Sequence, residues 1–315
     1  GVFVTGATQS PYTGDGVTVA VLDTGIDAGH EAFAGVTLIE EDFTGEGNGD
    51  GNGHGTHVAG TIFGQPKDGL RFSVAPGIRR ALIGKVLGAE GGGSTDQIFA
   101  AIQWAIDNGA VIINMSLGMD FPGYVARLTA AGWPTNLATS RALKAYRDNV
   151  RLFDAVVAMY RRRAAMAAES ALLVAAAGNE SKRDVDPNYM IDVAPPAAAD
   201  GIVSVAALAT PGAPHSALTV ASFSNINPQV SGPGAAIYSA KAGGGYRYLN
   251  GTSMASPHVA GIAALWAQWQ LNRPGGRIDF NMINAKLLGG ASGERLADPN
   301  DVVSTGAGLV QAPTV

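Results

Sequence analysis

Short apolar runs rich in β-branched residues alternate with alanine-rich stretches along most of the chain. The apolar runs cover residues 17–22, 84–87, 111–115, 172–176 and 202–205. Between the second and third runs, residues 97–106 repeat apolar positions at helical spacing. Continuous apolar strands that alternate with helices indicate a parallel sheet covered on both faces. The pattern therefore predicts an α/β fold with a mostly parallel central sheet.

Glycines and small polar residues follow the first four apolar runs directly. These segments are 23–25, 88–93, 116–118 and 178–180. In open parallel sheets, ligands bind beyond the carboxyl ends of the strands. We therefore expect chemical groups from four distant parts of the chain to meet at one edge of the sheet.

A serine stands where a glycine turn runs into a strongly helical segment. Ser253 follows Gly251 and precedes the apolar stretch 259–266. The free backbone N–H groups and the dipole at a helix start favour negative charge beside that hydroxyl. A serine becomes a useful nucleophile only when a base removes its proton and donors hold the developing oxyanion. The chain must then supply a base, an orienting acid and a further donor.

Two of the five histidines lie close together, and only one of them has the setting of a base. His54 stands between two glycines, and His57 opens an apolar helical run. An imidazole at a glycine-flanked helix start is well placed for proton transfer. The two rings could also share a metal ion, but no third ligand follows at zinc-like spacing. We therefore favour His54 as the base and His57 as a packing residue.

A carboxylate and an amide end two of the other predicted strands. Asp23 closes a fully apolar run, where an unpartnered carboxylate is costly. Asn179 follows two alanines and a glycine at the end of another run. Both residues also fit ordinary turn or cap positions. In the functional interpretation, Asp23 partners the base and the Asn179 amide donates to an oxyanion.

Five segments resemble, in sequence and in order, the motifs of the subtilisin-like serine proteases. The segments are 23–25, 54–60, 114–118, 176–179 and 251–258. The resemblance spans roughly residues 15–310 and implies the three-layer subtilisin-like α/β fold. It further implies a single peptidase domain over residues 1–315, with a helical insertion at about 119–171.

The resemblance implies a role for each matching catalytic residue. Ser253 would be the nucleophile, His54 its general base, and Asp23 the group that orients the imidazole. The Asn179 side chain and the Ser253 backbone N–H would form the oxyanion hole.

The same resemblance implies substrate contacts. The segments Gly91, Gly92, Gly93 and Ser116, Leu117, Gly118 would hold a peptide between them as an added strand. Ala176, Ala177 and Gly178 would wall the pocket for the residue before the scissile bond, and such small walls favour large apolar side chains. Met254 would face the leaving group, with an oxidisable thioether.

The segment 119–171 is longer than in the simplest members of that family. From residue 134 to 163, apolar residues recur at steps of three and four, which indicates one long or two broken amphipathic helices. We favour a packing elaboration. The alternative is an element that recognises substrate or docks a partner.

Composition limits the partners and the compartment. The 315 residues are 46% hydrophobic and 15% charged, with a formal net charge of −5 and no cysteine. We expect polypeptide substrates and a monomer, with neither nucleic acid nor membrane as a partner. Because the chain begins at Gly1, we expect a processed N-terminus with a cleaved propeptide. The absence of cysteine fits secretion of the bacterial type, which we favour, and a cytoplasmic location, which is the alternative.

The resemblance implies no cofactor for the chemistry, while structural calcium is common in such proteins. The loop 64–71, where one calcium site is usually built, contains Lys67 and Arg71, which argues against that site. Other oxygen ligands occur in two groups, which solvated turns explain equally well, so metal positions stay open. The groups are Glu46, Asp50, Asn52 and Asp184, Asp186, Asp192.

Three functions fit these residues. The leading one is a serine endopeptidase of broad specificity that works through an acyl-enzyme. A peptide ligase or macrocyclase on the same scaffold is the second. The third, a catalytically silent binding module, is disfavoured because all four catalytic positions are present.

Overall fold

The computed structural model describes residues 1–165, 170–210 and 216–314, and an eight-stranded sheet forms its centre. The strand order is β2-β3-β1-β4-β5-β6-β7, with β8 paired to β6. Only the pairing of β6 with β7 is antiparallel within this sheet. The strands are β1 Thr18–Asp23, β2 Thr37–Asp42, β3 Arg80–Lys85, β4 Ile112–Met115, β5 Leu172–Ala176, β6 Ile202–Ala209, β7 Thr219–Val220 and β8 Val230–Pro233.

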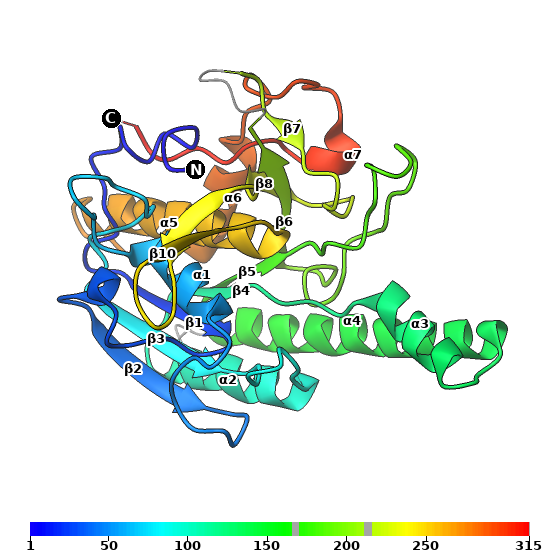
Figure 1. Cartoon of the computed structure of the whole chain (residues 1–315). Coiled ribbons are helices and arrows are strands. Elements are labelled where there is room, and N and C mark those ends of the chain that lie inside the picture. Colours follow the sequence, from blue (N-terminus) through cyan, green and yellow to red (C-terminus); the bar gives the residue numbers. More distant parts are fainter. Residues whose placement is uncertain (166–169, 211–215, 315) are drawn as a thin grey trace.

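Helices cover both faces of the sheet (Figure 1). Helices α1 (His54–Phe63), α5 (Thr252–Leu271) and α6 (Phe280–Gly289) lie on one face. Helices α2 (Thr95–Asp107) and α4 (Thr135–Ala165) lie on the other. The predicted three-layer α/β fold is thereby confirmed.

The alternation of side chains along the strands explains this arrangement. In β1, Val19 and Val21 belong to the core beneath α1 and α5, while Ala20 and Leu22 belong to the core beneath α2 and α4. Successive strand residues point to opposite faces, so an entirely apolar strand needs a cover on both sides.

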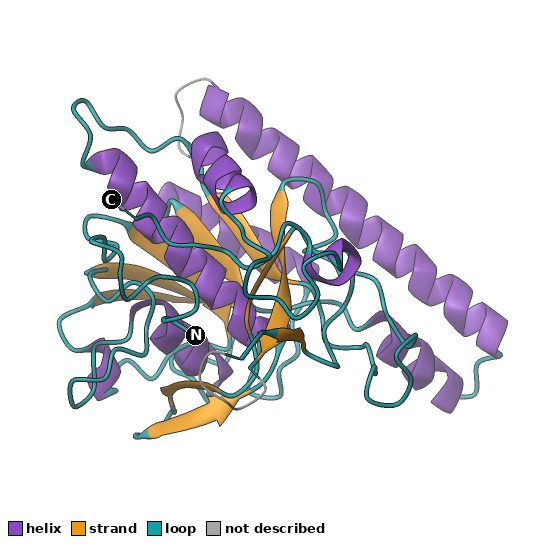
Figure 2. Cartoon of the chain, turned by 90° about the horizontal axis from the view of Figure 1, so that it is seen from above, coloured by secondary structure: helices purple, strands orange, loops and turns teal. Residues whose placement is uncertain are grey.

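Smaller elements complete the fold. The hairpin of β9 (Ile237–Ala240) and β10 (Tyr246–Leu249) is antiparallel and forms a separate two-stranded sheet. A 3₁₀ turn, η1 (Glu31–Phe33), and the short helix α7 (Val302–Thr305) lie in connections. Helix α3 (Phe121–Ala130) lies beside the first turns of α4, which Figure 2 shows as a long helix along one side of the molecule. None of the helices within the described ranges has the length and apolarity needed to cross a membrane.

One predicted strand boundary needs correction, and one open alternative is decided. The run 84–87 was expected to be a strand, but β3 starts at Arg80 and ends at Lys85. The strand ends there because the N–H groups of Val86 and Leu87 both donate to the carbonyl oxygen of Asp23. In the segment 119–171, the periodic stretch forms one unbroken α4 of 31 residues, preceded by the separate α3.

The sheet order brings the expected edge together. Strands β3, β1, β4 and β5 are consecutive neighbours, so the residues after each of them share one edge. Helices α1 and α5 start at His54 and Thr252 respectively, within the motifs singled out in the sequence.

Candidate active site

Asp23 and His54 form a close pair at this edge. Asp23 is the last residue of β1 and is completely buried, and its Oδ1 lies 2.7 Å from His54 Nδ1. Because a carboxylate only accepts, the Nδ1–H of the imidazole donates, which leaves Nε2 as a free acceptor in the neutral ring. Asp23 also accepts from the Thr24 N–H at 2.8 Å, so the carboxylate is fixed in place. The pair therefore presents a basic nitrogen in a set orientation.

Opposing influences act on the protonation of His54. Burial of the ring is the largest influence and lowers its pKa. The charge and hydrogen bond of Asp23, followed by the charge of Asp50, outweigh burial, so the pKa of His54 lies above its usual value. His57, by contrast, is buried, and burial lowers its pKa to about 4. Its Nε2–H donates to the carbonyl oxygen of Ile237 at 2.9 Å, so His57 ties α1 to β9 as a neutral ring.

Two residues that the sequence pattern did not single out for this role hold the helix start that carries His54. Asp50 accepts hydrogen bonds from the backbone N–H groups of Gly53 and Thr56 and from the hydroxyls of Thr24 and Thr56. Arg247, from β10, donates to the carbonyl oxygen of Gly53 at 2.7 Å. Asp50 lies three residues before the cap residue Gly53, so the usual rule for a capping side chain does not find it. No local signal pointed to Arg247, which is 194 residues away.

Ser253 lies in the first turn of α5, and a network of side chains ties that turn to the end of β4. Its Oγ donates to the carbonyl oxygen of Ser116 at 3.2 Å, so this proton is not directed at His54 in the present conformation. In return, Ser116 Oγ donates to the carbonyl oxygen of Ser253 at 2.9 Å. Asn114 donates to Ser116 and accepts from Ser256, which completes the network.

Asn179 is exposed and is oriented by α5. Its Oδ1 accepts from the Thr252 N–H at 2.8 Å and from the Thr252 hydroxyl at 3.0 Å. The amide Nδ2 has no acceptor within the part of the chain that the structure describes. The N–H of Met254 donates to Gly251, and the N–H of Ser253 has no acceptor among those same residues. Two donors, the Asn179 amide and the Ser253 N–H, are therefore available to a ligand oxyanion.

The two expected substrate segments line one cavity. Gly91, Gly92 and Gly93 lie on one side of a space of about 540 Å³, and Leu117 and Gly118 lie on another. A Cβ added at Gly91 or Gly92 would meet nothing within 4 Å, so a peptide backbone has free access there. Residues of α2, α3 and α4 line other parts of it, together with connecting residues such as Pro195 and Pro196.

The residues expected to wall the pocket before the scissile bond lie deeper than expected. Ala176 and Ala177 are buried at the end of β5, and Gly178 has a left-handed backbone with a φ of 113°. A pocket next to Asn179 is lined by Glu180, Ala194 and side chains of α3 and α4, among others. Met254 is only 1% exposed, which limits the access of an oxidant to its sulfur.

The acidic groups considered as calcium ligands are engaged in other contacts or exposed. The carboxylate of Asp50 caps α1, and Glu46 pairs with Lys85 at 3.2 Å. Asp184, Asp186 and Asp192 are exposed. Within the described ranges, no three His, Asp or Glu side chains are grouped closely enough to hold a metal ion.

Comparisons with known proteins agree with this geometry. A sequence model of the Subtilase family matches residues 14–295. Subtilisin DY of Bacillus licheniformis is 36% identical over 261 residues, which is 81% of this chain and 77% of the relative. Subtilisin-like protease 6 of Trichophyton verrucosum is 33% identical over 268 residues, which is 81% of this chain but only 52% of that relative. The crystal structure of a cold adapted subtilisin-like serine proteinase has a TM-score of 0.66 at 27% identity, covering 97% of this chain and 92% of its own.

Proposed function

The chain belongs to the subtilase family and is a serine-type endopeptidase, and we propose that Asp23, His54 and Ser253 are its catalytic triad. In this proposal, Asn179 Nδ2 and the Ser253 N–H hold the oxyanion. The observation that carries it is the 2.7 Å contact between His54 Nδ1 and the fully buried Asp23. It leaves a basic Nε2 at the edge where Ser253 lies in the first turn of α5.

Acylation starts with the serine proton. The Ser253 hydroxyl turns from the Ser116 carbonyl oxygen to His54 Nε2, which takes the proton as Oγ bonds the scissile carbonyl carbon. The carbonyl oxygen becomes an oxyanion between the Asn179 amide and the Ser253 N–H. The imidazolium, stabilised by Asp23, then gives its proton to the leaving amine as the C–N bond breaks.

Deacylation repeats these steps with water. His54 takes a proton from a water molecule, and the oxygen of that water attacks the ester carbon. The tetrahedral intermediate collapses, the C–O bond to Ser253 breaks, and His54 returns the proton to the serine. Subtilases need no cofactor for this chemistry.

The finer properties follow from the same proposal. We expect broad specificity with large apolar residues preferred before the scissile bond, on polypeptide substrates, by a monomeric enzyme. Residues 1–315 would form one peptidase domain. A cleaved propeptide, secretion of the bacterial type and a structural calcium ion are further expectations that the family brings.

One experiment tests this function. Cleavage of a diverse peptide library, with and without a chelator, reports activity, side-chain preference and metal dependence together. Turnover that persists in the chelator would agree with chemistry performed by protein side chains alone. The mass of the products in the presence of a peptide amine separates hydrolysis from ligation. Ligated product in excess of hydrolysed product would overturn the hydrolase assignment, and no reaction at all would favour a binding module.

Loss of the amide donor should slow the chemical step selectively. In Asn179→Ala we expect kcat to fall by about 10²–10³-fold with little change in KM, a size taken from subtilisin, which belongs to the same family. The reason is that the oxyanion exists only after attack, so its donor contributes little to ground-state binding. Steady-state kinetics on one peptide measures both constants. A rise in KM at unchanged kcat would assign Asn179 to substrate binding instead.

As the pH is lowered, activity should be lost with a midpoint above the ordinary pKa of a histidine side chain. Asp23 and Asp50 together raise the pKa of His54 above its usual value despite its burial. The protonated ring cannot accept the serine proton, so activity is present above that raised pKa and lost as the pH falls through it. The midpoint of the acid limb of kcat/KM should therefore lie above the ordinary value of about 6.5. A midpoint clearly below that value would contradict His54 as the base.

A further inference from the structure

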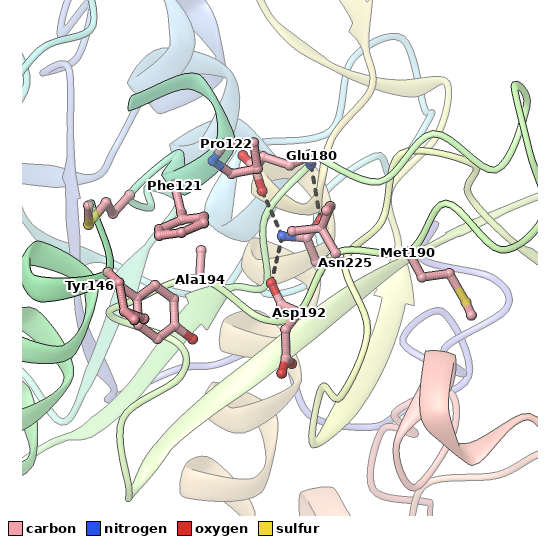
Figure 3. Close-up of a pocket in the computed structure, with 11 residues that line it drawn as sticks. Phe121, Pro122, Tyr146, Glu180, Met190, Asp192, Ala194 and Asn225 are labelled. Atoms are coloured by element: carbon pink, nitrogen blue, oxygen red, sulfur yellow. Dashed lines mark hydrogen bonds between the residues drawn. The ribbon is translucent and has the colours of Figure 1, made fainter. Parts of the chain in front are cut away.

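A pocket of about 340 Å³ lies beside the proposed oxyanion donor (Figure 3). Glu180, which follows Asn179, lines one side, and Met119, which follows Gly118, lines another. The N–H of Met119 donates to the Pro195 carbonyl oxygen at 2.9 Å, and the N–H of Ala194 donates to Ala177 at 2.8 Å. These bonds join the two segments that flank the proposed substrate site into one rigid frame around the pocket.

Helices α3 (Phe121–Ala130) and α4 (Thr135–Ala165), here called the α3–α4 hairpin, supply an apolar side of this pocket. Phe121 comes from α3, and Leu143 and Tyr146 come from α4. The rings of Phe121 and Tyr146 meet edge to face at a centroid distance of 6.0 Å. In Figure 3 both rings lie on one side of Ala194, opposite Glu180 and Asn225.

The hairpin is fixed against the body of the molecule at two points of α4. The Tyr146 hydroxyl donates to the carbonyl oxygen of Val193 at 2.7 Å. One turn further along α4, Asn149 Oδ1 accepts from the Thr95 hydroxyl, at the start of α2, at 2.8 Å. A wall that is tied at two points keeps its shape when a ligand enters, which favours selective binding.

The opposite side of the pocket carries a carboxylate. Glu180 Oε2 accepts from Asn225 Nδ2 at 2.6 Å and from the Asn179 N–H at 3.0 Å. No Lys or Arg of the described chain forms an ion pair with it. Burial, the largest influence, raises the pKa of Glu180 and so does the neighbouring charge of Asp120, while the hydrogen bond from Asn225 lowers it. A substrate carboxylate would lose its hydration here without gaining a cationic partner, while an apolar group would meet the hairpin.

We propose that the α3–α4 hairpin forms one wall of the pocket for the substrate side chain that precedes the scissile bond, and that Phe121 and Leu143 set how strongly this pocket prefers large apolar side chains. The inference rests on the proposed function, because the pocket is assigned to that side chain by its place next to Asn179 and Gly118. It makes the segment 119–171 a specificity element, where the sequence favoured a packing role.

The test compares peptides that differ only in the residue before the scissile bond, which is Phe, Ala or Lys. In Phe121→Ala, the ratio of kcat/KM for the Phe peptide over the Ala peptide should fall by about tenfold, because the pocket loses one apolar wall. Phe121→Leu should restore most of the ratio. Leu143→Ala should lower it by about threefold. Leu143 is 57% exposed, so this variant should fold.

Leu152→Ala is the matched control. Leu152 lies on the same helix and is 44% exposed, but it does not line the pocket, so the ratio should stay at the wild-type value. Unchanged ratios in both Phe121→Ala and Leu143→Ala would overturn the assignment of the wall. Equal kcat/KM of the wild type for the Phe and the Ala peptide would overturn the apolar preference of the pocket. Failure of the proposed function would look different, because the wild type would then cleave none of the three peptides.

Discussion

Ser253→Ala should lower kcat by about 10⁶-fold while the protein keeps its fold and still binds peptides, a size taken from subtilisin in the same family. The substitution removes only Oγ, so no acyl-enzyme can form. The backbone N–H of residue 253, the Asn179 amide and both substrate segments stay in place. Within the protein, the change also removes the 3.2 Å hydrogen bond from this hydroxyl to the Ser116 carbonyl oxygen.

Two measurements on Ser253→Ala separate chemistry from binding. Single-turnover kinetics on a fluorogenic peptide reports the residual rate, and inhibition of the wild-type reaction by the inactive variant reports peptide capture. Ser231→Ala is a useful control, because this buried hydroxyl donates to the carbonyl oxygen of Thr305 and takes no part in the network around Ser253. Turnover of Ser253→Ala within about 100-fold of wild type would reject Ser253 as the nucleophile.

His54→Ala should cost about as much as Ser253→Ala, close to 10⁶-fold in kcat, because the triad acts as a unit. Without the imidazole, the serine proton has no acceptor, and buried Asp23 loses its partner at 2.7 Å. His57→Ala provides the matched comparison on the same helix. It removes a buried ring and its bond to Ile237, and should lower the free energy of unfolding by about 2–4 kcal/mol.

The two histidine variants should therefore separate in different assays. Hydrolysis rates should collapse for His54→Ala, whereas thermal or urea unfolding should change most for His57→Ala. At a temperature where His57→Ala is fully folded, its kcat should stay within about tenfold of wild type. If the variants exchange these behaviours, the base has been assigned to the wrong histidine.

Much of the central sheet could be predicted because its strands are locally distinct. Strands β1, β4 and β5 lie within one residue of the apolar runs, since a strand covered on both faces is apolar throughout. The start of strand β3 was missed because its first residue is the charged Arg80. The Arg80 side chain donates to the carbonyl oxygen of Asn108 and is not part of the apolar core. The apolar Val86 and Leu87 then extended the predicted strand beyond its end.

The site was predictable where a residue carries its own signal. Asp23, His54, Asn179 and Ser253 each lie near a strand end or a helix start within a recognisable motif, and the sheet order explains how they share one edge. The roles assigned to them stay predictions until variants are measured.

Groups that act through distant contacts could not be found in this way. Arg247, in the β9–β10 hairpin, donates to the Gly53 carbonyl oxygen, and Ala194, in the connection after β5, lines the pocket next to Glu180. The direction of the Ser253 hydroxyl depends on a side-chain rotamer, which no pattern of residues specifies. Likewise, periodicity indicated the helices of the segment 119–171 but not the side on which they meet a pocket.

The most direct test of the triad is to label the protein with a serine-directed fluorophosphonate and to locate the adduct by peptide mass spectrometry. We predict one adduct per chain, on Ser253, that forms in wild type and in His57→Ala but not at a comparable rate in His54→Ala. An adduct on another residue, or peptide hydrolysis that continues at full rate with Ser253 unlabelled, would contradict the account.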